Sequence, residues 1–119
     1  MDEYRAMILL DMVGDRDLRL TLSVDTPPEL ARTTLRLAEE LDIRDHVGYY
    51  PHGNILDDHR PFQELGIPSI NLIDFEYGRG NRYWHTAEDS LDKLSADSLQ
   101  TAGDLALHLL WEVAGNRVK

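Results

Sequence analysis

The distribution of apolar residues predicts two strands in the first quarter of the chain. Residues 6–13 form a nearly continuous apolar run that ends at Gly14-Asp15, and the one polar member of the run is Asp11. Such a run is typical of a strand buried on both faces of a parallel or mixed sheet, with a short core helix as the alternative. Residues 18–24 alternate strictly between apolar and polar, which predicts a strand with one face toward solvent.

Two longer segments have the periodicity of helices. Thr26 and Glu29 flank two prolines at the spacing of a capping box, so we expect a helix to begin there. A second helix is predicted after Ser95, which would cap it. The apolar face of the first helix comprises Leu30, Thr34, Leu37, Ala38 and Leu41. That of the second comprises Leu99, Ala102, Ala106, Leu109, Leu110 and Val113.

The middle of the chain is less regular. A short strand is possible at residues 47–50, and Asp58 is expected to cap a short helix that ends near Leu65. The apolar run Ser69–Phe75 predicts a second buried strand, and residues 76–90 predict a loop. Buried strands that alternate with amphipathic helices indicate an α/β fold. In such sheets the ligand site lies at the carboxyl ends of the strands.

Composition narrows the class of protein. The 119 residues fit a single segment of one domain, and the 22 acidic against 12 basic residues give a net charge of −10, which argues against nucleic-acid binding. The absence of Cys excludes a disulfide scaffold and a Cys-ligated zinc site. No apolar run is long enough for a membrane span, and the acidic residues of segment 1–15 do not suit a signal peptide. Cytoplasmic and exported locations both stay open.

Three groups of residues are candidates for chemistry. A carboxylate inside an apolar strand is costly unless it is paired or bound, so Asp11 is either a functional residue or a strand end that reaches solvent. The adjacent Asp57 and Asp58 suit proton transfer and could orient His59, or one of them caps a helix. The third group is Trp84-His85. Zinc is commonly bound by His, and a neighbouring Trp can form the floor of an apolar pocket.

Four motifs follow one another in a fixed order. They are Leu-Asp-Met-Val-Gly-Asp at 10–15, Asp-Asp-His at 57–59, Gly-Ile-Pro at 66–68 and Tyr-Trp-His-Thr at 83–86. This series resembles the carboxyl-terminal half of the catalytic domain in the zinc aminopeptidase and glutaminyl cyclase superfamily. The resemblance covers residues 6–114. It implies a zinc-exopeptidase-like mixed β-sheet flanked by helices, here an incomplete domain, with zinc at the strand ends.

The resemblance also implies roles for individual residues. His85 matches a zinc ligand. Asp11 matches a residue that binds the second metal in two-zinc aminopeptidases, but belongs to a proton network in single-zinc cyclases. Asp57 matches the first Asp of the cyclase motif and would act with Asp11 in catalysis by sharing a proton, with Asp58 and His59 as the supporting pair.

The substrate is left open between the two branches of the superfamily. Trp84 matches the cyclase residue that lines the pocket for an amino-terminal glutamine. Cyclases carry a His after the Gly-x-Pro turn, where this chain has Asn71. A peptide and an amino-terminal Gln are therefore both candidate substrates.

Most of the superfamily's metal ligands have no match here. The remaining Asp and Glu ligands and the catalytic Glu lie upstream of the Leu-Asp-Met strand, and residues 1–10 match none of them. We therefore predict a segment of a zinc-dependent aminopeptidase or glutaminyl-cyclase-like enzyme that acts on peptide amino termini. Because catalytic zinc uses three protein ligands, the isolated chain should bind zinc weakly and be inactive. The alternatives are a non-catalytic half-domain that self-associates through an exposed sheet edge, and a misassigned start at Met1.

Overall fold

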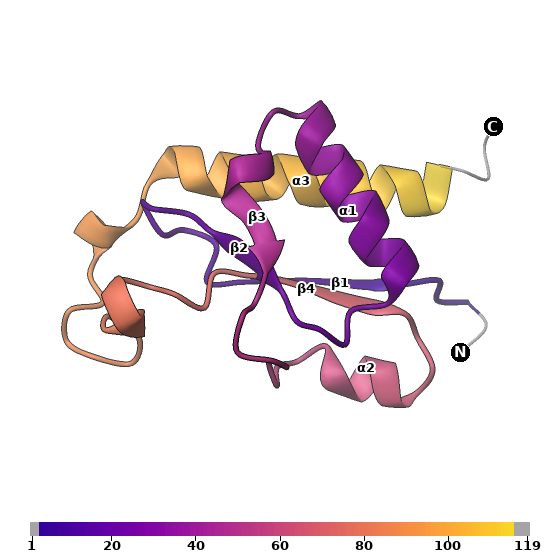
Figure 1. Cartoon of the computed structure of the whole chain (residues 1–119), viewed down its shortest axis with the longest axis horizontal. Helices are drawn as coiled ribbons and strands as arrows, with labels where there is room; N and C mark the ends of the chain where they lie inside the picture. The colour runs from indigo at the N-terminus through magenta and orange to yellow at the C-terminus, as the bar shows by residue number, and fades with distance from the viewer. Residues whose placement is uncertain (1–2, 116–119) are drawn as a thin grey trace.

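A computed structural model describes residues 3–115, which form a mixed sheet covered by helices (Figure 1). The four strands lie in the order β1-β4-β2-β3. β1 pairs in parallel with β4, β4 pairs antiparallel with β2, and β2 pairs in parallel with β3. The strands are β1 (Met7–Asp11), β2 (Leu20–Leu22), β3 (Val47–Tyr49) and β4 (Ser69–Ile73). This arrangement confirms the predicted mixed α/β sheet.

Helices lie on both sides of this sheet. α1 (Pro28–Glu40) and α3 (Ala96–Gly115) contact one another above the sheet, and α2 (Arg60–Glu64) lies below it (Figure 1). Three short 3₁₀ turns, at 44–46, 79–81 and 91–93, complete the elements. Within residues 3–115, no helix combines the length and the apolar character that a bilayer span requires.

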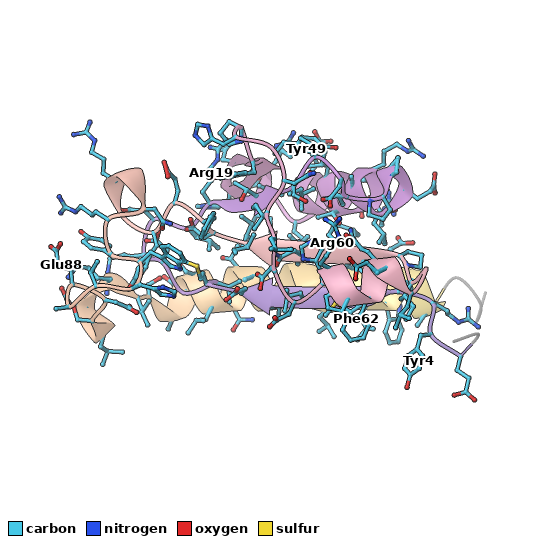
Figure 2. All side chains as sticks on the ribbon, turned by 90° about the horizontal axis from the view of Figure 1, so that it is seen from below. Tyr4, Arg19, Tyr49, Arg60, Phe62 and Glu88 are labelled. Carbon is cyan, nitrogen blue, oxygen red and sulfur yellow. The ribbon has the colours of Figure 1, made fainter. Side chains whose placement is uncertain are left out.

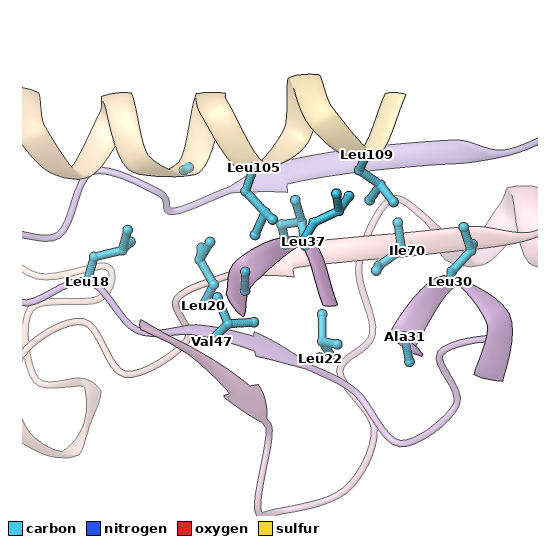
Figure 3. Packing of buried hydrophobic residues seen from close by; sticks show 13 residues of the cluster. Leu18, Leu20, Leu22, Leu30, Ala31, Leu37, Val47, Ile70, Leu105 and Leu109 are labelled. Carbon is cyan, nitrogen blue, oxygen red and sulfur yellow. The ribbon is translucent and has the colours of Figure 1, made fainter. Parts of the chain in front are cut away.

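The hydrophobic core fills the space between the sheet and the pair α1 and α3 (Figure 3). Leu20 and Leu22 of β2 and Ile70 and Leu72 of β4 point into it and are fully buried. Because side chains alternate along a strand, Thr21, Asn71 and Ile73 point to the opposite face. The core therefore takes one face of the sheet and leaves the other face for polar groups. The helices contribute Leu30, Ala31, Leu37, Ala38, Ala102, Leu105 and Leu109.

The position of each strand in the sheet corrects two predictions. β2 was expected to have a face in solvent, but all three of its residues are buried, because it lies between β4 and β3. The Thr21 hydroxyl is satisfied there by donating to the Ile73 carbonyl at 2.9 Å. β1 was expected to be buried on both faces, but it is an edge strand and Leu10 is 44% exposed. β4, in contrast, is buried along its whole length, as predicted.

The predicted helix starts also gave mixed results. Ser95 caps α3 as expected, since its Oγ accepts the Ser98 N–H at 3.0 Å. Thr26 does not cap α1: its hydroxyl donates to the Ser23 carbonyl, and α1 has no side-chain cap. α2 likewise begins without a side-chain cap, so the expected role of Asp58 there was wrong. The predicted apolar face of α3 was partly wrong. Leu99 and Leu110, which were assigned to it, are half exposed, and Leu105, which was not, is fully buried.

Candidate active site

Three polar side chains meet on the sheet face that α2 and its preceding loop cover. Asp11 ends β1, Asn71 lies in the middle of β4, and Asp57 lies in the loop before α2. The Asn71 amide donates to Asp57 Oδ2 at 3.0 Å, and the carboxyl groups of Asp11 and Asp57 share a hydrogen bond. β1 and β4 pair in parallel, so their side-chain ladders place Asp11 and Asn71 on the same face. The structure thus brings together the two predicted catalytic carboxylates.

The two carboxyl groups have different proton affinities. Burial, the hydrogen bond to Asp57 and the charge of Asp57 raise the pKa of Asp11 to about 6. Burial also opposes ionisation of Asp57, but hydrogen bonds from Asp11, the Asp58 N–H and Asn71 outweigh it and lower the pKa of Asp57. The pair therefore holds one proton in mildly acidic solution, and that proton belongs chiefly to Asp11.

Asp58 and His59 were predicted to support Asp57, and this role stays a prediction. Asp58 is exposed, and only its backbone N–H reaches the site, by donating to Asp57 Oδ1 at 2.8 Å. His59 is 1% exposed, and in the described part of the chain neither ring nitrogen has a hydrogen-bond partner. The Asn71 Oδ1 is also buried without a partner. An unsatisfied buried polar group costs about 1–3 kcal/mol, so these atoms are a local cost of the fold.

Trp84 and His85 form a second part of the site. The two rings stack at a centroid distance of 4.0 Å, and both side chains are exposed on one side. They line a pocket of about 320 Å³ together with Asp11. His85 and Met12, the residue after Asp11, both have positive φ, at 56° and 53°. Non-glycine residues seldom adopt this conformation, and it recurs at functional sites.

Sequence reasoning missed a second pair of carboxylates. Asp15 and Asp74 are 5% and 0% exposed, and they share a hydrogen bond. Burial raises the pKa of Asp74 to about 7, and the hydrogen bond and charge of Asp15 add to the increase. Hydrogen bonds from the backbone N–H groups of Arg19 and Glu76 act in the opposite direction and lower this pKa. The signal was present in the sequence, because Asp74 interrupts the apolar run Ser69–Phe75 just as Asp11 interrupts the first run.

Zinc is the cofactor that the resemblance implies, and the described residues do not fit it by themselves. Residues 3–115 contain no group of three His, Cys, Asp or Glu side chains arranged to hold a metal. His85 and Asp11 line the same pocket, but two ligands fall short of the three that catalytic zinc sites use. The ligand roles of His85 and Asp11 stay predictions.

Comparisons with known proteins identify the family. The sequence model of Peptidase family M28 matches residues 1–110, and the chain belongs to this family. The curated aminopeptidase YwaD of Bacillus subtilis is 41% identical over 64 residues, which are 52% of this chain and 14% of that protein. The match confirms the resemblance drawn from the four motifs.

Solved structures confirm the fold. A glutaminyl cyclase from an Acidobacteriales bacterium superposes with a TM-score of 0.84 at 36% identity, over 93% of this chain and 39% of that one. BSAP, a zinc aminopeptidase from Bacillus subtilis, gives a TM-score of 0.70 at 32% identity, over 91% of this chain and 28% of that one. The glutaminyl cyclase of Porphyromonas gingivalis gives a TM-score of 0.77 at 28% identity, over 94% of this chain and 44% of that one. The chain thus spans less than half the length of each of these proteins.

Proposed function

We propose that this chain supplies the proton-transfer and substrate-pocket portion of an M28-family enzyme that acts on peptide amino termini. The observation that supports this most directly is the hydrogen-bonded pair of Asp11 and Asp57 beside the pocket of Trp84 and His85. The reaction is hydrolysis of the first peptide bond or cyclisation of an amino-terminal glutamine. Both require a proton to move between substrate atoms, and a positioned carboxyl pair can hold that proton.

The residues of the site divide this work between them. Asn71 and the Asp58 N–H donate to the two oxygens of Asp57 and fix the orientation of its carboxylate. Asp11 reaches from this pair into the pocket wall, and Trp84 presents a ring against which the first side chain of a substrate can pack. Asn71 thus donates to Asp57 at the position where cyclases carry a His. For this reason we favour no single branch of the superfamily.

The isolated chain is expected to be inactive and to bind zinc weakly. In a longer protein His85 would supply one of the zinc ligands, and zinc would contribute Lewis-acid chemistry. Purified chain, with added zinc, should turn over neither an aminoacyl chromogenic substrate nor a Gln-initiated peptide above the metal blank. Turnover by the pure chain would contradict this part of the proposal.

A chimeric enzyme tests the site itself. This chain would replace the corresponding segment of the Acidobacteriales glutaminyl cyclase, and both activities would be measured after circular dichroism has verified folding. Replacing Asp57 by Asn should reduce kcat by about 10²–10⁴-fold, the range for general acid–base groups. Glu39→Gln, on the exposed face of α1, is the matched control and should leave kcat unchanged. Equal kcat values for the two variants would contradict the proposal.

The second candidate is self-association through the β1 edge. An apolar groove of about 430 Å³ runs between β1 and α3, lined by Ile8, Leu10, Leu107 and Leu110 among others. Leu10, Leu107 and Leu110 are 44–59% exposed, and β1 pairs with a strand on one side only. An unpaired edge beside apolar side chains is a template for a second strand. We propose a homodimer in which two β1 strands pair across a twofold axis.

Light scattering on the purified chain tests the dimer. Leu110→Glu in the groove should shift the mass from dimer to monomer. Leu91→Glu, at an 83% exposed site outside the groove, changes charge equally and should not. A monomeric wild-type chain at high micromolar concentration would contradict self-association.

A further inference from the structure

A second pocket lies on the same sheet face as the candidate active site. It has a volume of about 370 Å³ and is lined by residues from β2 and the segment before it, from the end of β3 and the loop after it, and from the segment after β4. Thr21 lines it, and Thr21 pairs with Ile73 in the β2–β4 register, on the face opposite the hydrophobic core. The volume is within the range of small-ligand sites. The family resemblance assigned nothing to this pocket.

Aromatic rings form much of its wall. Tyr49, Tyr50 and Phe75 line it, together with Pro51, and Tyr49 is 50% exposed. Rings of this kind present flat apolar surfaces on which another ring can stack or pack edge to face.

A row of rings connects this pocket with the candidate active site. Trp84 lines the first pocket and packs edge-on against Phe75 at a centroid distance of 5.4 Å. Phe75 in turn lies 5.9 Å from Tyr50, and both line the second pocket. A ligand that leaves the first pocket over Trp84 therefore crosses a continuous aromatic surface before it reaches Tyr50.

The charges around the second pocket indicate which ligand fits. Arg19 lies across Gly48, where an added Cβ would come within 3.3 Å of its guanidinium. The structure of residues 3–115 gives this guanidinium no ion pair, so it is available to a ligand. Asp17 and Glu76 also line the pocket, which makes its formal charge −1 with His52 neutral. The excess negative charge repels a carboxylate, whereas a guanidinium attracts the face of an aromatic ring.

We propose that this second pocket binds an uncharged aromatic side chain of a peptide whose amino terminus occupies the first pocket. The peptide nature of the ligand rests on the proposed function; the preference for an aromatic ring rests on the pocket itself. An extended chain advances about 3.3–3.6 Å per residue, so the ring steps from Trp84 to Tyr50 correspond to about three residues. The third or fourth residue of the peptide is therefore the one that the pocket selects.

The test measures binding by the chain itself and needs no catalysis. N-acetylphenylalanine amide would be titrated into ¹⁵N-labelled chain and followed by amide chemical shifts, with the leucine and glutamate analogues as comparison probes. We expect saturable shifts centred on Tyr49, Arg19 and Phe75. The Kd for the phenylalanine probe should be about 2- to 10-fold lower than that for leucine, as the extra energy of aromatic pairs implies. The glutamate probe should bind more weakly than both.

Two variants locate the binding. Tyr49→Ala removes a half-exposed ring from the pocket and should weaken phenylalanine binding at least threefold. Tyr4→Ala removes a 61% exposed ring that lies away from this pocket and should leave the Kd unchanged (Figure 2). Arg19→Gln should reduce the preference for phenylalanine over leucine. Amide spectra that retain the wild-type dispersion establish that each variant is folded.

The possible outcomes separate this inference from the proposed function. Equal Kd values for phenylalanine and leucine, or shifts that Tyr49→Ala leaves unchanged, would overturn the aromatic pocket. Aromatic binding at this pocket together with an inactive chimera would leave the pocket established and the proposed enzyme reaction refuted. In an active chimera, Gln-initiated peptides with Phe at position three or four should have a lower KM than those with Glu there. Equal KM values would overturn the link between the two pockets.

Discussion

Two hydrogen-bonded carboxyl pairs lie near the carboxyl ends of β1 and β4, and their surroundings differ. Asp74 is completely buried, and its two oxygens accept the N–H groups of Arg19 and Glu76, both at 3.0 Å. Asp11 and Asp57 are only partly buried, and Asp11 lines a pocket whose wall also includes Asp15, the partner of Asp74. The two pairs therefore differ in how deeply they are buried and in the backbone N–H groups that Asp74 accepts.

The largest effect is expected from removing the buried carboxylate. Asp74→Ala removes a completely buried side chain and leaves the N–H groups of Arg19 and Glu76 without their acceptor, so the free energy of unfolding should fall by about 2–5 kcal/mol. Asp57→Ala should cost less, about 2 kcal/mol, because Asp57 itself is only partly buried. Urea unfolding at pH 6 measures both. Asp74→Asn, which retains one acceptor oxygen, should lie between them, and equal losses for the two alanine variants would remove the distinction between the pairs.

The pH dependence of stability provides a second test. The folded-state pKa of Asp74, about 7, lies above its ordinary value of 3.8. The folded state therefore binds the proton more tightly, and this stabilisation is complete below about pH 4 and is lost as the pH rises through 7. The loss should be on the order of 3 kcal/mol.

Substitutions at the two pairs should change this profile unequally. Asp74→Asn should flatten the fall in stability between pH 5 and 8 more than Asp11→Asn does, because the pKa of Asp11 reaches only about 6. Urea midpoints across this range measure the slopes. A steeper fall in the Asp74→Asn protein than in the wild type would show that the assigned direction is wrong.

A smaller effect on stability is expected at Asn71, whose amide supports the partly buried pair of Asp11 and Asp57. Asn71→Leu removes the donor to Asp57 and should lower the free energy of unfolding by about 1–2 kcal/mol, within the range for hydrogen bonds to charged groups. Asn54→Leu, on an exposed loop, is the control and should change it by less than about 0.5 kcal/mol. If the two variants unfold at the same urea concentration, the contact with Asp57 contributes nothing to stability.

The smallest change in stability is expected at His59. Both of its ring nitrogens are buried without a partner, so His59→Phe removes unsatisfied polar atoms and keeps a similar shape. The free energy of unfolding should stay within about 1 kcal/mol of the wild type, or rise. Thermal unfolding measures this. A loss above about 2 kcal/mol would mean that the imidazole makes a stabilising interaction.

Much of the fold could be predicted from local patterns. The run from Ser69 predicted a buried strand because its apolar residues are nearly continuous, and its two polar members in β4, Ser69 and Asn71, are buried with it. Ser95 predicted the start of α3 because its hydroxyl oxygen can accept the Ser98 N–H, and the same hydroxyl also donates to Ser98 Oγ at 2.9 Å. Thr26 failed as a cap because the turn that precedes it offers the Ser23 carbonyl to the same hydroxyl.

Strand position and the second carboxyl pair were harder to predict. Alternation in β2 indicates two unlike faces, but whether the polar face meets solvent depends on β3 and β4, which follow in the chain. The apolar run of β1 cannot show that the strand lies at an edge. Asp11 and Asp57 were identified as a pair through the family motifs. Asp74 stood in an equally apolar context, but nothing in its neighbourhood indicated that Asp15 would meet it.

The strand order also sets a sequence of events during folding. β2, α1 and β3 are contiguous in the chain and can assemble as soon as they are made, because their contacts close short loops. β1 precedes this unit in the chain, yet its pairing partner β4 follows the unit. β1 can thus join this sheet only after β4 has been made. Its amides should exchange with solvent sooner than those of β4, which strands on both sides protect.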